Sequence, residues 1–142
     1  MKLNIGCGRD IRKGWVNIDI SKEVGADCVW DIRKGIPLSD NTVDEIAINN
    51  VLCQIDKEFK DVMNELWRVC RGSITLRVPN AEDICAFQDP EDCRRFTDQT
   101  FTYMQYGHRR YEQYGKHYGY KPFDVELLEK GVQLTFKLCP RK

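Results

Sequence analysis

The chain has 142 residues, about 42% of them hydrophobic, which is enough for one domain (residues 1–142) with one core. Its 22 basic and 22 acidic residues cancel, so overall charge indicates neither a nucleic-acid-binding protein nor a membrane-surface protein. The charge is uneven, however, because residues 94–142 carry ten Lys/Arg and only five Asp/Glu.

Short apolar runs predict six strands, and the first four are nearly continuous, as in parallel strands covered on both faces. The last run alternates apolar with polar residues, which favours an edge strand, antiparallel to its neighbour, with one face in water. The predicted strands are residues 3–6, 16–20, 27–30, 44–49, 74–78 and 132–138.

The clearest helical pattern covers residues 57–71, where apolar side chains recur every three or four residues. Asp56 stands where an N-cap is expected, and Gly72 follows the last turn as a C-terminal signal. Together with the strands, this helix predicts an α/β protein: a Rossmann-like three-layer sandwich with a mainly parallel sheet and an antiparallel C-terminal strand.

Two further helices are predicted in the C-terminal part. One starts at Thr97, where Phe96 and Phe101 have the spacing of a hydrophobic staple around a threonine cap. The other is short, covers residues 124–130 and ends at Gly131.

The segment Gly6-Cys7-Gly8 follows the first predicted strand, and Asp19 ends the second. Ligands of parallel sheets bind past the carboxyl ends of the strands, where glycines allow close approach to the backbone and a carboxylate accepts hydrogen bonds from ribose hydroxyls. This pattern favours a pocket for an adenosine-bearing ligand, although a tight turn beside a surface aspartate would have the same sequence. About nine residues separate the two strands, too few for a full crossover helix.

The glycine segment narrows the choice of ligand. A dinucleotide site needs a third glycine three residues after the second, and that position is Ile11. Asp10 would repel a pyrophosphate, and the chain has no Gly-Lys-Ser/Thr phosphate loop. S-adenosyl-L-methionine, which carries no phosphate, fits better as the cofactor.

The segment LNIGCG (residues 3–8) followed by GWVNIDI (residues 14–20) resembles the small class I S-adenosylmethionine-dependent methyltransferases, whose pattern is LNLGCG…GWVNVD. In order and spacing the similarity extends over most of the chain to about residue 103. It continues through residues 31–38, 41–46, 65–69, 77–80 and 86–90.

The resemblance implies a role for each matching residue of a cofactor site. Gly6 and Gly8 would line the methionine part, and Asp19 would hold the ribose hydroxyls. Asp31 and Ile32 would face the adenine, and the two asparagines after the fourth strand would border the methyl group and the methionine tail. Asp31 could equally cap a turn, and the asparagines could equally be a polar strand end. The implied cofactor-binding residues are Gly6, Cys7, Gly8, Asp19, Ile20, Asp31, Ile32, Asn49 and Asn50.

No catalytic residue can be assigned from the sequence, because methyl transfer from a sulfonium needs positioning above all and no metal. A general base would matter only for a protonated acceptor, and the candidates are Asp89, Asp92, His108 and His117. Seven cysteines without a Cys-x-x-Cys pair predict reduced, mostly buried thiols, neither a disulfide framework nor a zinc site. With no signal peptide and no membrane-spanning apolar run, we expect a cytoplasmic protein without a membrane partner.

The most unusual composition lies in residues 94–121, which hold all six tyrosines, both histidines and an excess of arginine and lysine. Basic residues interleaved with aromatics bind an anionic small molecule or stack the bases of a nucleic acid. The alternative is that the apolar residues pack on the sheet while the cations face water. We expect residues 94–122 to be a substrate-side insertion over the methyl-acceptor site.

These observations predict an S-adenosylmethionine-dependent methyltransferase with an unidentified acceptor. Two alternatives remain open: a catalytically degenerate cofactor-binding or partner-binding module, and a nucleic-acid-binding protein that uses the Tyr/Arg-rich segment. The sequence leaves the oligomeric state open.

Overall fold

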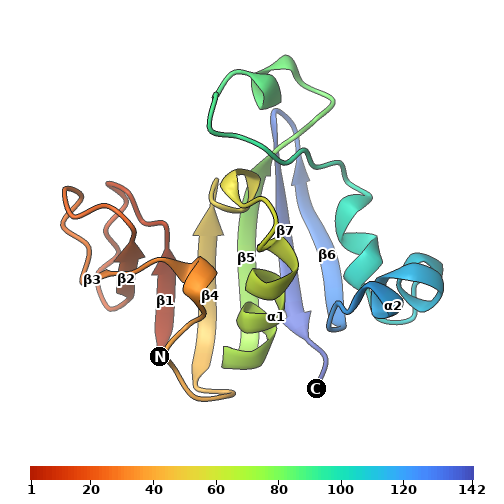
Figure 1. The fold of residues 1–142 in the computed structure, drawn as a ribbon, viewed down its shortest axis with the longest axis horizontal. Helices are drawn as coiled ribbons and strands as arrows, with labels where there is room; N and C mark the ends of the chain where they lie inside the picture. Colours follow the sequence, from red (N-terminus) through yellow and green to blue (C-terminus); the bar gives the residue numbers. More distant parts are fainter.

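The computed structural model describes all residues, 1–142. A seven-stranded sheet in the order β3-β2-β1-β4-β5-β7-β6 forms its centre (Figure 1). The first five strands pair in parallel, and β7 runs antiparallel to both of its neighbours. The predicted Rossmann-like fold, with a mainly parallel sheet and an antiparallel C-terminal strand, is confirmed. The strands are β1 (Lys2–Ile5), β2 (Val16–Asp19), β3 (Cys28–Val29), β4 (Val43–Asn49), β5 (Cys70–Pro79), β6 (Phe123–Lys130) and β7 (Gln133–Pro140).

Helix α1 (Phe59–Val69) is the only helix longer than five residues, and its buried stripe is the one that the sequence periodicity predicts. The remaining helices are single turns. They are η1 (Ile32–Lys34), η2 (Leu52–Gln54), η3 (Ile84–Phe87), η4 (Thr100–Met104), the π-helical turn η5 (Tyr111–Gly115) and α2 (Lys116–Tyr118). None of these helices is both long and apolar enough to cross a membrane.

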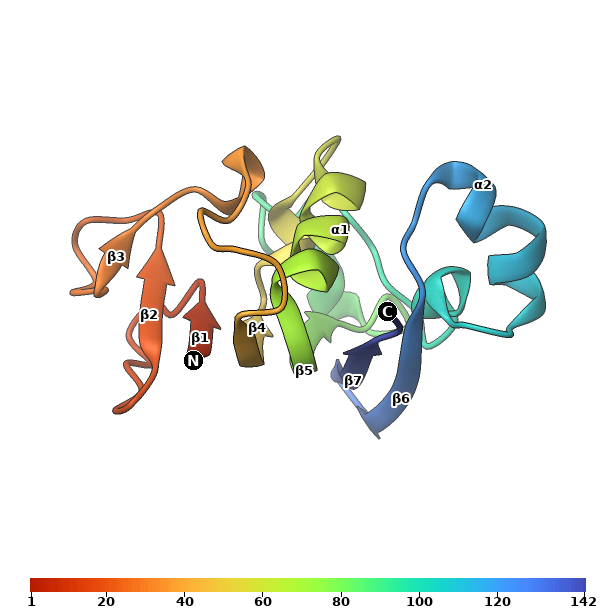
Figure 2. The ribbon, with the colours of Figure 1, turned by 90° about the horizontal axis from the view of Figure 1, so that it is seen from below.

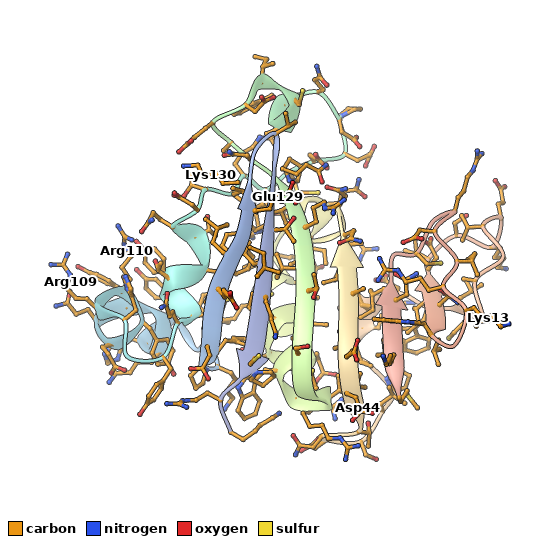
Figure 3. The ribbon with its side chains drawn as sticks, turned by 180° about the vertical axis from the view of Figure 1, so that it is seen from behind. Lys13, Asp44, Arg109, Arg110, Glu129 and Lys130 are labelled. Atoms are coloured by element: carbon orange, nitrogen blue, oxygen red, sulfur yellow. The ribbon has the colours of Figure 1, made fainter.

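The two faces of the sheet are covered unequally, so the third layer of the predicted sandwich is missing: the short β1–β2 and β2–β3 connections contain no helix. Helix α1 and the turns lie against one face (Figure 2), whereas no helix covers the other (Figure 3). In β5 the side chains of Ile74, Leu76 and Val78 are buried, and those of Thr75 and Arg77 between them are exposed. The uncovered face tolerates water because polar side chains line it, as in sheets with one solvated side.

The connection from β1 to β2 contains no helix, as its length predicts. Two buried asparagines organise it instead. Asn4 Nδ2 donates to Asn17 Oδ1 and to the Asp10 carbonyl, and Asn17 Oδ1 also accepts from the Arg12 N–H. The asparagine side chains thus form hydrogen bonds with backbone groups of the loop. These bonds hold the loop at β1 and β2, where a crossover helix would otherwise lie.

The predicted helix over residues 124–130 is wrong: these residues belong to β6, the edge strand, so β7 is not at the edge. The residue types favour a helix, but β7 offers a row of unpaired backbone groups that strand β6 satisfies. Gly131, expected as a helix end, lies in the β6–β7 hairpin, where its N–H donates to the Gln133 carbonyl.

The ends of α1 also differ from the prediction. The helix starts at Phe59 after Glu58, and Asp56 contributes its backbone carbonyl to the Phe59 N–H rather than a side-chain cap. At the other end the chain passes directly into β5, which contains Gly72. A Cβ at Gly72 would overlap the Asp44 carbonyl, so this glycine permits close approach of two strands instead of ending a helix.

The helix predicted at Thr97 is a 3-10 turn over Thr100–Met104. The expected staple contact is nevertheless present, because the rings of Phe96 and Phe101 stack with centroids 5.7 Å apart. Thr97 Oγ1 accepts a hydrogen bond from the Gln99 N–H at 3.2 Å.

A charged cluster on α1 fixes the segment before β4. The guanidinium of Arg68 donates to the carboxylates of Glu65 and Asp40 and to the carbonyls of Ile36 and Leu38. Glu65 Oε2 also accepts from the Ile36 N–H at 2.8 Å. These hydrogen bonds, mainly those from Arg68, hold the pKa of Glu65 below its usual value of 4.5.

The variant Glu65→Gln is expected to lose about 1–2 kcal/mol of unfolding free energy at pH 7, because a charge-assisted pair becomes a neutral one. The lowered pKa means that the unfolded chain binds more protons below about pH 4.5, so this stabilisation exists above that pH and disappears as pH falls. Urea unfolding at pH 7 and near pH 3 measures both values. A difference between variant and wild type that stays constant with pH would contradict this origin.

Candidate functional site

A pocket of about 320 Å³ lies past the carboxyl ends of β1, β2 and β4, on the side of the sheet that carries α1. This volume is at the lower end of the range for small-molecule sites. Half of its lining is hydrophobic. The lining residues are Ile5, Gly6, Ile18, Asp19, Ile20, Trp30, Asp31, Ile32, Arg33, Asn50, Val51, Gln54, Ile55 and Glu91.

The glycine turn and Asp19 are joined directly. Asp19 Oδ2 accepts from the Gly8 N–H and Oδ1 from the Ser21 N–H, each at 2.9 Å. The carboxylate is therefore fixed at the pocket wall and points to the glycine turn. Each of its oxygens has a further lone pair for a ligand hydroxyl.

At Gly6 the backbone comes close to the Val51 side chain. Its φ of +64° lies in the left-handed region, and a Cβ here would overlap the Val51 side chain. Only glycine adopts this conformation without strain and leaves room for the Val51 side chain.

Asp31 also lines the pocket and caps η1. Its Oδ1 accepts from the backbone N–H and Nε of Arg33, and its Oδ2 from Nη2. The Arg33 guanidinium lowers the pKa of Asp31, so the carboxylate stays charged at neutral pH. Asp31 therefore caps a turn, as the sequence allowed, and it lines the pocket as well.

Of the nine implied cofactor-binding residues, six line the pocket: Gly6, Asp19, Ile20, Asp31, Ile32 and Asn50. The side chain of Cys7, in the middle of the turn, is buried. Gly8 contacts the pocket residue Asp19 by donating its N–H to the carboxylate. Asn49 ends β4 opposite Arg77 in the register, outside the pocket lining. Asn50 has a φ of +56°, and its Nδ2 lies 3.5 Å from Gln133 Oε1.

Sequence reasoning missed several pocket residues. Trp30 packs against the core and lines the pocket, and its Nε1 donates to the Gly35 carbonyl at 2.7 Å. Its place at the end of the third predicted strand was the available signal. No signal pointed to Glu91, because it reaches the pocket from a loop that follows β5.

The base candidates and the Tyr/Arg-rich segment are absent from the pocket lining, although Glu91, between Asp89 and Asp92, belongs to it and Arg94 Nε donates to the carbonyl of the lining residue Ile55 at 3.1 Å. None of Asp89, Asp92, His108 or His117 lines it, and neither does any residue of 94–121. Most of this segment lies beside β6, at the opposite edge of the sheet from β2 and β3 (Figure 1).

The seven cysteines are free thiols, but only Cys7, Cys53 and Cys70 are buried, fewer than predicted. Burial, followed by the carboxylate of Asp92, raises the pKa of Cys53 to about 12. Burial and Asp19 likewise raise the pKa of Cys7. Both thiols remain protonated at neutral pH and are poor nucleophiles.

A comparison of the sequence with protein-family models and with curated proteins finds no match. Solved structures of S-adenosylmethionine-dependent methyltransferases are similar in fold. One from Thermotoga maritima has a TM-score of 0.66 at 14% identity, covering 99% of this chain and 82% of its own. One from Archaeoglobus fulgidus has 0.64 at 14%, covering 96% and 84%, and one from Aquifex aeolicus has 0.57 at 17%, covering 96% and 79%. The chain therefore has the Rossmann-like fold of S-adenosylmethionine-dependent methyltransferases.

Proposed function

We propose that this protein is an S-adenosylmethionine-dependent methyltransferase whose cofactor occupies the pocket between the glycine turn and Asp31. The observation that carries the proposal is the hydrogen bond from the Gly8 N–H to the Asp19 carboxylate. This bond joins the glycine turn and the carboxylate at the wall of one cavity. The fold likeness to methyltransferases supports the same conclusion.

The residues present suit the cofactor. Asp19 can accept hydrogen bonds from the ribose hydroxyls, and Gly6 presents bare backbone in the pocket lining, where the amino-acid tail can lie. Trp30 and Ile32 offer apolar surface for an adenine ring. No phosphate-binding group is needed, in agreement with the absence of a phosphate loop in the sequence.

The cofactor supplies an activated methyl group on a sulfonium, and no metal is required. The protein's part is to hold the donor and to exclude water around it, because correct positioning alone contributes about 7–11 kcal/mol. Asn50 and Glu91 are polar side chains at the pocket wall that can contact an acceptor. The acceptor in this proposal is a small or anionic molecule. The cytoplasmic location stays a prediction.

The cofactor proposal predicts that S-adenosylhomocysteine stabilises the protein. At a concentration about 100 times its Kd, the ligand should add about 2.7 kcal/mol to the unfolding free energy. For a chain of this size this corresponds to about 5–10 °C in Tm. Differential scanning fluorimetry and calorimetric titration measure the effect, with adenosine 5′-diphosphate as the control ligand. An equal response to both compounds, or none to either, would disprove the cofactor assignment.

A further inference from the structure

The Tyr/Arg-rich segment forms a surface of its own that the proposed methyl transfer does not use. Its turns η5 and α2 lie beyond β6, at the far edge of the sheet from the pocket (Figure 1). We use "tyrosine patch" for the side chains of Tyr103, Tyr114 and Tyr118 on this surface.

The three rings of the tyrosine patch lie against one another. Their centroids are 6.3–6.5 Å apart, and the ring of Tyr118 is inclined by only 15° to that of Tyr103 and by 29° to that of Tyr114. Tyr114 is 46% exposed and Tyr118 is 53% exposed. Large exposed aromatic side chains that gather in this way are typical of a binding surface.

The support beneath the tyrosine patch is fixed. Tyr111, on the same turn, is buried, and so is Met104 in η4. Gly115 is also buried, and a Cβ there would overlap the Tyr103 carbonyl, so this glycine lets the two turns meet. The rings are therefore held in place before any partner binds, which reduces the entropy lost on binding.

Positive charge surrounds the rings. Arg109 projects from the segment away from the sheet (Figure 3). The guanidinium of Arg110 lies 5.9 Å from the Tyr103 ring centroid and donates to Gln99 Oε1 and Thr102 Oγ1. Lys116 lies between Tyr114 and Tyr118 in the chain and pairs with Glu112 at 3.0 Å. Glu112 is the only acidic residue between residues 105 and 121.

The composition of this surface distinguishes between kinds of partner. The exposed residues between 105 and 121 include no aliphatic side chain. Tyrosine and arginine are also enriched in protein–protein interfaces, but residues 105–121 carry four Lys/Arg against one Glu, and this excess of cations among exposed rings is typical of single-stranded nucleic-acid binding. Double-stranded nucleic acid keeps its base faces stacked, so the rings would have nothing to contact.

We propose that the tyrosine patch binds single-stranded nucleic acid, with bases stacked on Tyr114 and Tyr118 and phosphates held by Arg109 and Lys116. This site is separate from the cofactor pocket. It does not depend on the proposed methyl transfer.

The test is fluorescence anisotropy with a labelled oligothymidylate and an oligouridylate of about 12 nucleotides at about 50 mM salt. The double variant Tyr114→Ala/Tyr118→Ala should weaken binding by about tenfold or more, the loss expected for removed base stacking. Tyr106→Ala is the matched control, because Tyr106 is 52% exposed in the same segment but its ring faces Arg141. Arg109→Ala should lower the slope of log affinity against log salt by about 0.7.

Two further measurements distinguish base stacking on the tyrosine patch from binding at the cofactor pocket and from attraction of any polyanion. Asp19→Asn should bind the oligonucleotides as the wild type does, and polyglutamate should compete poorly because it has no bases. The proposal is overturned if neither oligonucleotide binds, if Tyr106→Ala loses as much affinity as the double variant, or if polyglutamate competes as well as the unlabelled oligonucleotide. A loss of oligonucleotide binding in Asp19→Asn would also overturn it.

Discussion

The variant Asp19→Asn is expected to bind S-adenosylhomocysteine about 100-fold or more weakly than the wild type. The Asp19 carboxylate is fixed by the N–H groups of Gly8 and Ser21, and its free lone pairs face the pocket. Two charge-assisted hydrogen bonds to ribose hydroxyls are worth about 1.5–3 kcal/mol each, and asparagine cannot replace both. Isothermal titration calorimetry measures the change.

A matched control for this variant is Glu23→Gln. Glu23 also follows β2, but it lies outside the pocket lining. Its replacement should leave the affinity within about twofold, since exposed charges at this distance are screened by salt. If Asp19→Asn keeps wild-type affinity while its Tm without ligand is unchanged, the ribose is held elsewhere and the cofactor site must be reassigned.

The variant Phe101→Ala is expected to lose about 3–5 kcal/mol of unfolding free energy. Phe101 is fully buried between Phe96, whose ring lies parallel at 5.7 Å, and Phe136 of β7, whose centroid is 4.8 Å away. Phe96 in turn contacts Phe59 at the start of α1. The Phe101 ring therefore connects α1, through Phe96, to the antiparallel strand β7. Removing it leaves a cavity that several elements share.

Urea unfolding at equilibrium measures this loss. Phe87→Ala serves as the control because it makes the same chemical change at a side chain that is 57% exposed. Its ring contacts mainly the Arg95 guanidinium at 4.6 Å, so the expected cost is below about 1 kcal/mol. Equal losses for the two variants would mean that the buried aromatic cluster does not contribute through packing.

The sequence predicted the elements that hold the glycine turn and Asp19 because their signals are local. Short apolar runs bounded by glycine and polar residues indicate β1 and β2, and parallel strands bring their carboxyl ends to one edge. The buried stripe of α1 likewise follows from a helical period that is visible in the residues themselves. The candidate site on this edge could therefore be proposed before any contact was known.

Strand β6 shows the limit of such reasoning. Residues 124–130 consist largely of helix-favouring types, yet they form a strand because β7 presents unpaired backbone groups beside them. A hydrogen-bonding partner across a hairpin and the rest of the sheet is a tertiary property. Composition alone cannot supply it.

Which loops contribute residues to the pocket was also decided only by the tertiary structure. Glu91 joins the pocket from a loop that follows β5, whereas the Tyr/Arg-rich segment, which the sequence assigned to the acceptor site, lies mostly at the opposite edge of the sheet. The sequence thus determined which residues end the strands and what ligand chemistry they favour. The packing of the loops decided which distant side chains share a pocket with these strand ends. This packing depends on long-range contacts, such as that of Phe101 with Phe136, which the sequence does not show.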